Sequence, residues 1–237
     1  MKLRPQIIPS SLLSVDVMVS TSSSEPVSPY RSQRCRPRQA LIEMLLLKFG
    51  ARNAWGTSWS KDGRFIIFGE GTPSDKTGFD LWIAPQFGDR KPYPYLQTQF
   101  NEVNGVYSPD GRWVAYASDE SGRYEIYVQS FPLSGAKFQV STGGGTEPVS
   151  RNDGTELFYE ASDQNLMAAP VKSGAKFEGG APMSLFRVPL ASAAGVLEHH
   201  TYAVSNDGKR FLMAAAVGGE KAPPITVVVN WQAELKK

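Results

Sequence analysis

The sequence predicts an all-β protein built from the four-stranded blades of a β-propeller. Three observations support this fold class: a recurring Asp-Gly motif, short alternating apolar runs after each copy of it, and a high content of turn-forming residues. The chain has 22 glycines and 17 prolines among 237 residues. Such a composition implies many turns and suits short strands better than a helical bundle.

One motif occurs four times along the chain. It consists of an apolar residue, a serine, one or two variable residues, Asp-Gly, a polar residue and then an alternating apolar run. Its copies are SWSKDGRFIIFGE (58–70), VYSPDGRWVAYAS (106–118), PVSRNDGTELFYEA (148–161) and AVSNDGKRFLMAA (203–215). The aspartates stand 48, 43 and 54 residues apart. A period in the forties with several strands in each unit is typical of propeller blades.

Each Asp-Gly pair predicts a tight turn between two strands. Glycine adopts positive φ without steric cost, and aspartate tolerates it. The preceding serine or asparagine can hydrogen-bond to the local backbone and tighten the turn. We therefore assign these pairs a structural role: Asp62–Gly63, Asp110–Gly111, Asp153–Gly154 and Asp207–Gly208.

Further apolar segments complete each unit. A third segment follows a polar loop at 79–85, 124–131, 164–171 and 224–231, and a fourth follows at 93–99, 137–142 and 183–188. Four strands make a blade, with the last unit ending at its third strand. The expected blades span 51–99, 100–142, 143–188 and 189–237. Because the last unit lacks a fourth strand, we expect an incomplete disc whose open edges favour self-association.

The first 50 residues differ in character. Residues 1–40 are rich in Ser, Pro and Arg and predict a disordered linker, whereas 40–49 could form a short helix that ends at Gly50. Residues 31–39 are basic and could contact nucleic acid or lipid, but a solvated linker is the simpler interpretation. Pro9 and Asp16 interrupt the first apolar stretch, so there is no clear signal peptide.

Charge and cysteine content exclude several classes of protein. Lys+Arg 25 against Asp+Glu 23 gives a net charge of +2, too balanced for nucleic-acid binding through bulk charge or for general attraction to membranes. The sequence contains no run of 18 apolar residues, which is about the length that a helix needs to span a bilayer. The single cysteine, Cys35, excludes an intrachain disulfide framework and a multi-cysteine zinc site.

Catalytic motifs are missing from the sequence. It lacks the glycine-rich loop, strand lysine, His-Arg-Asp and Asp-Phe-Gly of protein kinases, and the G-x-S-x-G elbow of α/β-hydrolases. The GGG run at 143–145 precedes no helix, which argues against a nucleotide cradle. His199 and His200 follow Glu198 and could bind a metal, but a solvent-facing pair is the simpler interpretation. We expect no catalytic residue, no cofactor and no metal.

The remaining conspicuous residues have structural explanations. The four turn aspartates belong to different blades and cannot share one catalytic centre; weak calcium binding by a single loop stays open. Large aromatic rings are expected to fill the gaps between blades, namely Trp55, Trp59, Trp82, Trp113 and Trp231.

A binding surface is expected where the loops between second and third strands meet the connections between blades. These loops comprise residues 69–79, 99–104, 118–123, 142–147, 161–163 and 188–200. The acidic loop SDESGRYE (118–125) is a candidate contact surface, although such loops are more often simply solvated. Within this surface the candidate binding residues are Asp119, Glu120, Arg123, His199 and His200.

The stretch YSPDGRWVAYASDESGRYEIYVQSFPLSGAKFQVSTGGG (107–145) resembles TolB-like, WD-repeat-like propeller blades. The resemblance covers about residues 52–237 and is closest to the C-terminal propeller of bacterial membrane serine/threonine kinases, through residues 87–102, 153–174 and 223–237. It implies a non-catalytic module that binds protein or a small ligand, derived from a kinase sensor half outside the cytoplasm. The alternatives are a TolB-like periplasmic scaffold and a propeller-based hydrolase.

Overall fold

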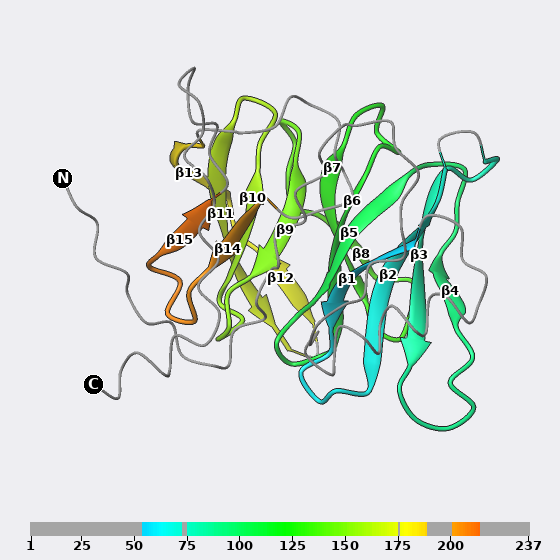
Figure 1. Ribbon diagram of the computed structural model, residues 1–237. Coiled ribbons are helices and arrows are strands. Elements are labelled where there is room, and N and C mark those ends of the chain that lie inside the picture. Colours follow the sequence, from blue (N-terminus) through cyan, green and yellow to red (C-terminus); the bar gives the residue numbers. More distant parts are fainter. Residues whose placement is uncertain (1–53, 73–74, 175, 189–200, 214–237) are drawn as a thin grey trace, which may run out of the picture.

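A computed structural model describes residues 54–72, 75–174, 176–188 and 201–213. Over these residues the protein is all-β, as predicted, and its antiparallel sheets stand side by side as propeller blades (Figure 1). The expected linker at 1–50, the helix at 40–49, His199, His200 and the strand at 224–231 lie outside the described residues.

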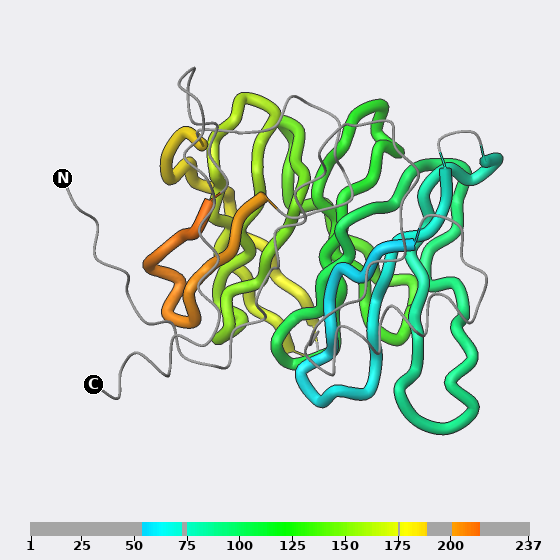
Figure 2. Tube along the Cα trace, in the orientation of Figure 1, coloured from blue at the N-terminus to red at the C-terminus, as the bar shows by residue number. Residues whose placement is uncertain are grey.

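Blades 1 and 2 have the predicted four strands in sequence order. Within each blade the chain runs back and forth between two edges (Figure 2). Blade 1 consists of β1 (Ala54–Trp59), β2 (Phe65–Gly71), β3 (Phe79–Pro85) and β4 (Tyr93–Leu96). Blade 2 consists of β5 (Glu102–Tyr107), β6 (Trp113–Ser118), β7 (Glu125–Ser130) and β8 (Lys137–Gln139).

Blade 3 contains one strand that the sequence did not predict. The expected strands are β9 (Thr146–Ser150), β10 (Glu156–Glu160), β11 (Asn165–Ser173) and β13 (Met183–Arg187). The long β11 pairs through its first half with β13, and through its last residues with the additional β12 (Phe177–Gly179). Blade 4 comprises, within the described residues, β14 (Tyr202–Val204) and β15 (Phe211–Met213).

A serine side chain bridges the two ends of three of the four Asp-Gly turns. In blade 1 the Ser60 hydroxyl donates to Asp62 Oδ1 at 2.6 Å and accepts from the Phe65 amide at 2.9 Å. Asp62 Oδ1 also accepts from the Arg64 amide at 3.0 Å, and Gly63 has a φ of 73°. The same bonds recur around Ser108 and Ser205 in blades 2 and 4.

Blade 3 reaches the same turn with different side chains. Arg151 stands where the other turns have serine, and its Nε lies 3.2 Å from Asp153 Oδ2. Its Nη1 contacts Glu156 Oε2 at 2.7 Å, while the Thr155 hydroxyl donates to Asp153 Oδ1 at 2.7 Å. An ion pair and a threonine therefore replace the serine bridge.

Alternating residues of each second strand pack against different blades. In β2, Ile67 joins Tyr107, Val114 and Tyr116 of blade 2 in one buried cluster. In β6, Val114 and Tyr116 thus face blade 1, whereas Ala115 belongs to the cluster that contains Leu157 and Tyr159 of blade 3. In β10, Phe158 packs against Tyr202 and Phe211 of blade 4. Because side chains alternate across a strand, blades 2 and 3 each pack against a neighbouring blade on both faces.

The tryptophans follow the expectation in part. Trp113 lies between blades 2 and 3, with its ring centroid 5.6 Å from that of Phe177 and its Nε1 donating to the Gly174 carbonyl at 3.2 Å. Trp55 is buried in the same core cluster. Trp59 and Trp82 instead flank a cluster formed by blade 1 alone.

Candidate binding rim

One edge of the propeller gathers the loops that the sequence selected as a binding surface. Within each antiparallel blade, the second strand ends and the third begins at this edge, and the preceding blade enters here as well (Figure 1). The Asp-Gly turns lie at the opposite edge. We call the described residues of these loops the rim: 69–72, 75–79, 99–104, 118–123, 142–147, 161–163 and 188.

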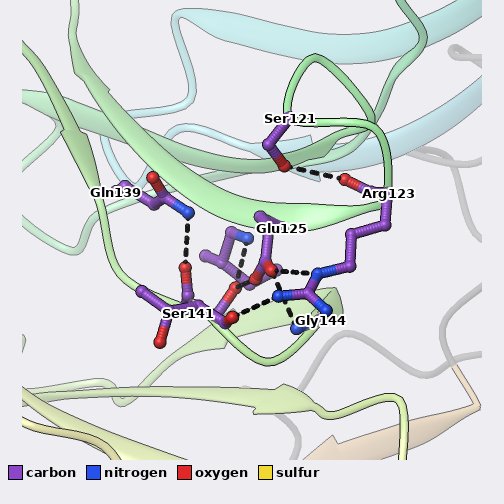
Figure 3. Close-up of polar contacts among 8 residues, drawn as sticks. Ser121, Arg123, Glu125, Gln139, Ser141 and Gly144 are labelled. Carbon is purple, nitrogen blue, oxygen red and sulfur yellow. Dashed lines mark hydrogen bonds and ion pairs between the residues drawn. The ribbon is translucent and has the colours of Figure 1, made fainter.

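A buried carboxylate organises the rim of blade 2. Glu125, at the start of β7, is almost completely buried. Its Oε1 accepts from Arg123 Nε at 2.7 Å and from the Gly144 amide at 2.9 Å, and its Oε2 accepts from the Ser141 hydroxyl (Figure 3). Since a buried charge needs partners, this glutamate ties the rim loop to the connection that leads into blade 3.

The surrounding bonds extend this network. Ser141 Oγ accepts from the Ile126 amide at 2.8 Å, and Arg123 Nη2 donates to the Thr142 carbonyl (Figure 3). The Gly144 amide in the GGG run is therefore occupied by the protein's own carboxylate. This arrangement gives Gly144 a structural role.

Blade 1 repeats the arrangement with other residue types. Asp80, at the equivalent position in β3, accepts through Oδ2 from Thr77 Oγ1 and Gln97 Nε2, both at 2.9 Å. Desolvation by burial raises the pKa of Asp80, and its two hydrogen bonds oppose that shift. In blade 3, Asn165 occupies the position. Third strands thus start with a polar side chain that fastens the rim.

The predicted binding residues Asp119, Glu120 and Arg123 all lie in the loop between β6 and β7. The structure brings them together but also gives each one a partner. Asp119 binds Asn101 through both carboxylate oxygens, at 2.9 and 2.6 Å. Asn101 Oδ1 in turn accepts from the Phe79 amide of blade 1 at 3.1 Å. Glu120 forms an ion pair with Lys137, which also lies 4.5 Å from the centre of the Tyr127 ring.

Two further buried glutamates have strongly shifted acidity. Desolvation raises the pKa of Glu102 to about 7, against hydrogen bonds from Thr98, whose hydroxyl donates to Oε1 at 2.5 Å. Glu102 Oε2 has no hydrogen-bond partner among the described residues. Desolvation, with a smaller contribution from nearby Glu147, raises the pKa of Glu160 to about 7. Both side chains are therefore largely protonated in mildly acidic solution.

Glu147 of blade 3 links the rim to blade 4 through hydrogen bonds. Its Oε2 accepts from the Thr201 amide and hydroxyl at 2.5 and 2.9 Å, and its carbonyl accepts from Tyr202 Oη at 2.8 Å. Its backbone has a φ of 53°, close to the 54° of Asn104 at the equivalent position in blade 2. Non-glycine residues seldom adopt this conformation, so these contacts hold a locally strained backbone.

The acidic side chains of the described residues are either spread apart or bonded within their own turns. Within the described ranges, no three His, Cys, Asp or Glu side chains are grouped so that they could hold a metal ion. Each turn aspartate is bound within its own turn, and the serine or threonine hydrogen bonds lower the pKa of Asp62, Asp153 and Asp207. Across the same described part of the chain, no helix is long and apolar enough to cross a membrane.

Sequence reasoning missed the buried carboxylates Asp80, Glu102 and Glu125. A usable signal exists for two of them, because Asp80 and Glu125 each stand second in their apolar third segment. A charge that recurs inside an apolar run, at one position of a repeat, indicates a buried and partnered group.

Comparison with known proteins agrees with this architecture. The chain is 40% identical over 83 residues to the Tol-Pal system protein TolB of Anaeromyxobacter dehalogenans, a match that covers 34% of this chain and 17% of the relative. The crystal structure of TolB from Acinetobacter baumannii superposes with a TM-score of 0.52 at 18% identity, covering 70% of this chain and 38% of that one. No protein-family model matches the sequence.

A weaker likeness links the fold to an enzyme. A puromycin-hydrolyzing peptidase of Mycobacterium tuberculosis aligns with a TM-score of 0.47 at 17% identity, over 63% of this chain and 26% of the peptidase. That likeness is too slight to carry a functional argument. The protein is a β-propeller with similarity to TolB, and the matches cover 17% and 38% of the lengths of these two TolB proteins.

Proposed function

We propose that this chain is a non-catalytic propeller module that binds a protein or a small ligand through the rim. The observation that carries the proposal is the network around Glu125. Its buried carboxylate accepts hydrogen bonds from Arg123, Ser141 and Gly144 and so fixes the geometry of the rim loops. Binding surfaces in propeller-like scaffolds lie on loops held by a rigid framework. A rim that is already ordered loses little conformational entropy when a partner binds.

The exposed part of the rim suits a polar partner. Asp75, Ser121, Gly122, Ser162 and Asp163 are exposed, and they come from three consecutive blades. Small polar residues with acidic neighbours can supply hydrogen bonds and charge without large apolar contact. A protein partner would therefore meet a wet, polar interface.

The similarity to TolB favours a scaffold of the bacterial envelope as the specific form of this function. In this reading the rim docks another envelope protein, and the chain performs no reaction. The resemblance to the propellers of membrane serine/threonine kinases supports a different parent, in which the module is the sensor half of a kinase. The nucleotide sequence directly upstream of Met1 distinguishes them, since a kinase domain and membrane helix encoded there would favour the second.

Site-specific photo-crosslinking tests the rim proposal. A photoreactive amino acid at Ser121 or Ser162 places the probe on the rim, and one at Asn152 or Asn206 places it at the Asp-Gly edge. We expect crosslinks to envelope proteins from the rim positions only. Equal crosslinking from both edges, or from the Asp-Gly edge alone, would contradict the proposal.

The module's lack of catalysis is tested separately. Purified protein is incubated with ester and peptide substrates, and turnover is compared with that of a variant altered at one rim residue, Asp163→Ala. We expect no turnover by either protein. Hydrolysis that the substitution abolishes would establish an enzyme and end the present proposal.

A further inference from the structure

The edge of blades 1 and 2 that carries the Asp-Gly turns differs in charge from the rim. The β1–β2 turn and the β3–β4 loop lie at the bottom of blade 1, away from the rim (Figure 1). This edge contains five basic and three acidic residues, whereas the rim contains two and seven. The two edges are therefore opposite in charge, although the net charge of the chain is only +2. We call the first of them the basic edge, with residues 60–64, 86–92, 108–112 and 131–136.

The cations of the basic edge are all exposed, namely Lys61, Arg64, Arg90, Lys91 and Arg112. Among the described residues, none of these five takes part in an ion pair. The guanidinium of Arg64 lies 5.4 Å from the centre of the Phe65 ring. Lys and Arg carry their charge at the end of a long flexible side chain, so these groups can reach a charged surface outside the molecule.

The three carboxylates of the same edge are bound close to the backbone. Asp62 and Asp110 each accept a hydrogen bond from the amide two residues further along the chain, at 3.0 and 3.2 Å. Asp89 accepts one from the Lys91 amide at 3.3 Å. Because these short side chains are held within their turns, the longer cationic side chains can extend beyond them. An approaching anionic surface therefore meets the positive groups first.

Two large apolar side chains are exposed among these cations. Phe87 is 66% exposed and Leu133 is 45% exposed. Each belongs to the loop that joins the third and fourth strands of its blade. The two blades thus repeat one combination at equivalent places, an exposed apolar residue beside exposed cations.

The loops that carry these apolar residues are anchored to the Asp-Gly turns. In blade 1, the amide of Gln86 donates to the Arg64 carbonyl at 2.8 Å. In blade 2, the amide of Phe131 makes the equivalent bond to the Arg112 carbonyl at 2.7 Å. Gln86 is itself buried and directly precedes the exposed phenylalanine. The backbone therefore fixes the apolar side chains next to the cations instead of leaving their placement to a free loop.

This combination fits an anionic lipid bilayer better than a protein partner. Apolar and aromatic side chains bordered by Lys and Arg are typical of protein surfaces that lie at a membrane interface. A stable protein interface needs a continuous patch of about 1,000 Å² with an apolar centre, whereas Phe87 and Leu133 stand on separate loops of different blades. A fluid layer of lipid headgroups can surround each of them separately.

We propose that the basic edge is a peripheral docking surface for an anionic lipid bilayer. Phe87 and Leu133 enter the headgroup region, and the five cations of this edge contact lipid phosphates. The rim then faces away from the bilayer and stays accessible to a partner. This inference is independent of the proposed binding function, because it concerns the opposite edge of the propeller.

Vesicle sedimentation with the full-length chain tests the proposal. The probes are vesicles of phosphatidylcholine alone and vesicles of phosphatidylcholine and phosphatidylglycerol in equal parts. We expect binding to the second kind only, and release at high salt, because salt screens exposed charges. Lys91→Glu and Phe87→Ser should each weaken binding about tenfold. The control Lys76→Glu makes the same charge change at an exposed residue of the rim, and should alter binding less than about twofold.

Several outcomes would overturn the proposal. One is the absence of binding to the anionic vesicles, and another is equal weakening by Lys76→Glu and Lys91→Glu, which would indicate attraction through bulk charge. Binding that survives both Lys91→Glu and Phe87→Ser would assign the contact to the basic residues at 31–39 instead. Binding to polyglutamate but not to the vesicles would indicate an acidic protein as the partner.

A fluorescent label gives a second measurement, which reports orientation. Cys35→Ser removes the only cysteine of the sequence, and Phe87→Cys or Ser121→Cys then carries an apolar, environment-sensitive dye at the basic edge or at the rim. We expect anionic vesicles to increase the emission of the dye at position 87 and to leave that at position 121 unchanged. An increase at both positions, or at 121 alone, would contradict the proposed orientation.

Discussion

Asn101 and Asp119 hold the junction of blades 1 and 2 together through a pair of hydrogen bonds. Asn101 donates its side-chain Nδ2 to Asp119 Oδ2 at 2.6 Å and its backbone amide to Asp119 Oδ1 at 2.9 Å. The same asparagine accepts the Phe79 amide. Asp119, which the sequence suggested as a binding residue, therefore also positions the loop on which any binding would take place.

Replacing Asp119 with alanine should destabilise the protein. The substitution leaves two partly buried donors of Asn101 without their acceptor, which costs about 1–3 kcal/mol of unfolding free energy. Urea denaturation measures the loss. The control is Glu178→Ala, whose exposed ion pair with Lys172 spans 3.6 Å and should be worth less than about 0.5 kcal/mol. Similar midpoints for the two variants would refute the structural role.

Removing the Glu125 carboxylate should affect the protein more strongly. Glu125→Ala leaves the Ser141 hydroxyl, the Gly144 amide and the Arg123 guanidinium without their shared acceptor. Loss of one partner from a buried charged network costs about 3–5 kcal/mol. The same denaturation experiment tests it. Arg123→Ala is the informative comparison, because Arg123 is exposed and Glu125 retains its other two donors; a larger cost for Arg123→Ala would contradict the hierarchy.

The turn of blade 3 predicts a tolerated substitution. The other three turns have a serine at the position of Arg151, namely Ser60, Ser108 and Ser205. In Arg151→Ser the new hydroxyl can therefore bridge Asp153 and the Glu156 amide. We expect a change of less than about 1 kcal/mol. Ser108→Ala removes the same bridge in blade 2 and leaves the buried Trp113 amide unbonded, at a cost of about 1–3 kcal/mol. Thermal unfolding in the two variants distinguishes the cases.

Alanine substitutions at two glycines distinguish the cost of a strained backbone from the cost of a steric clash. Gly111 has a φ of 69° and open space where a Cβ would lie, so Gly111→Ala should cost about 1–2 kcal/mol for the left-handed backbone alone. At Gly69 a Cβ would lie 2.5 Å from the Trp55 ring. Gly69→Ala must displace a buried indole and should cost more, with a change in tryptophan fluorescence. Equal costs and unchanged fluorescence would contradict this packing.

The fold was predictable because its units repeat. A single Asp-Gly turn has many explanations, but four in register, each followed by an alternating apolar run, indicate one sheet copied along the chain. The spacing also placed the third and fourth strands. β12 could not be predicted, because it pairs with an extension of β11 whose Pro170 and charged Lys172 do not resemble the other third strands.

The rim was predicted only by position. Loop topology located it, and Asp119, Glu120 and Arg123 were selected because they are charged. Their partners could not be read from the sequence, since Asn101 and Lys137 lie 18 and 17 residues away from the groups they bind. Such contacts depend on how two loops meet in space.

The stability of the protein should fall as the solution becomes less acidic, because of Glu102. Burial raises its folded-state pKa to about 7 from an ordinary value of 4.5, so the folded protein holds a proton that the unfolded chain has released between these two values. By linkage, this contribution is fully present below about pH 4.5 and is lost as the pH rises toward 7.

Glu102→Gln keeps the neutral form at every pH, so it should raise the unfolding free energy at pH 8 by about 1–2 kcal/mol and flatten the dependence of stability on pH. Urea unfolding at several pH values checks this, with Glu178→Gln as the control for surface charge. A profile that keeps its slope in Glu102→Gln would place the responsible proton elsewhere, with Glu160 the next group to substitute.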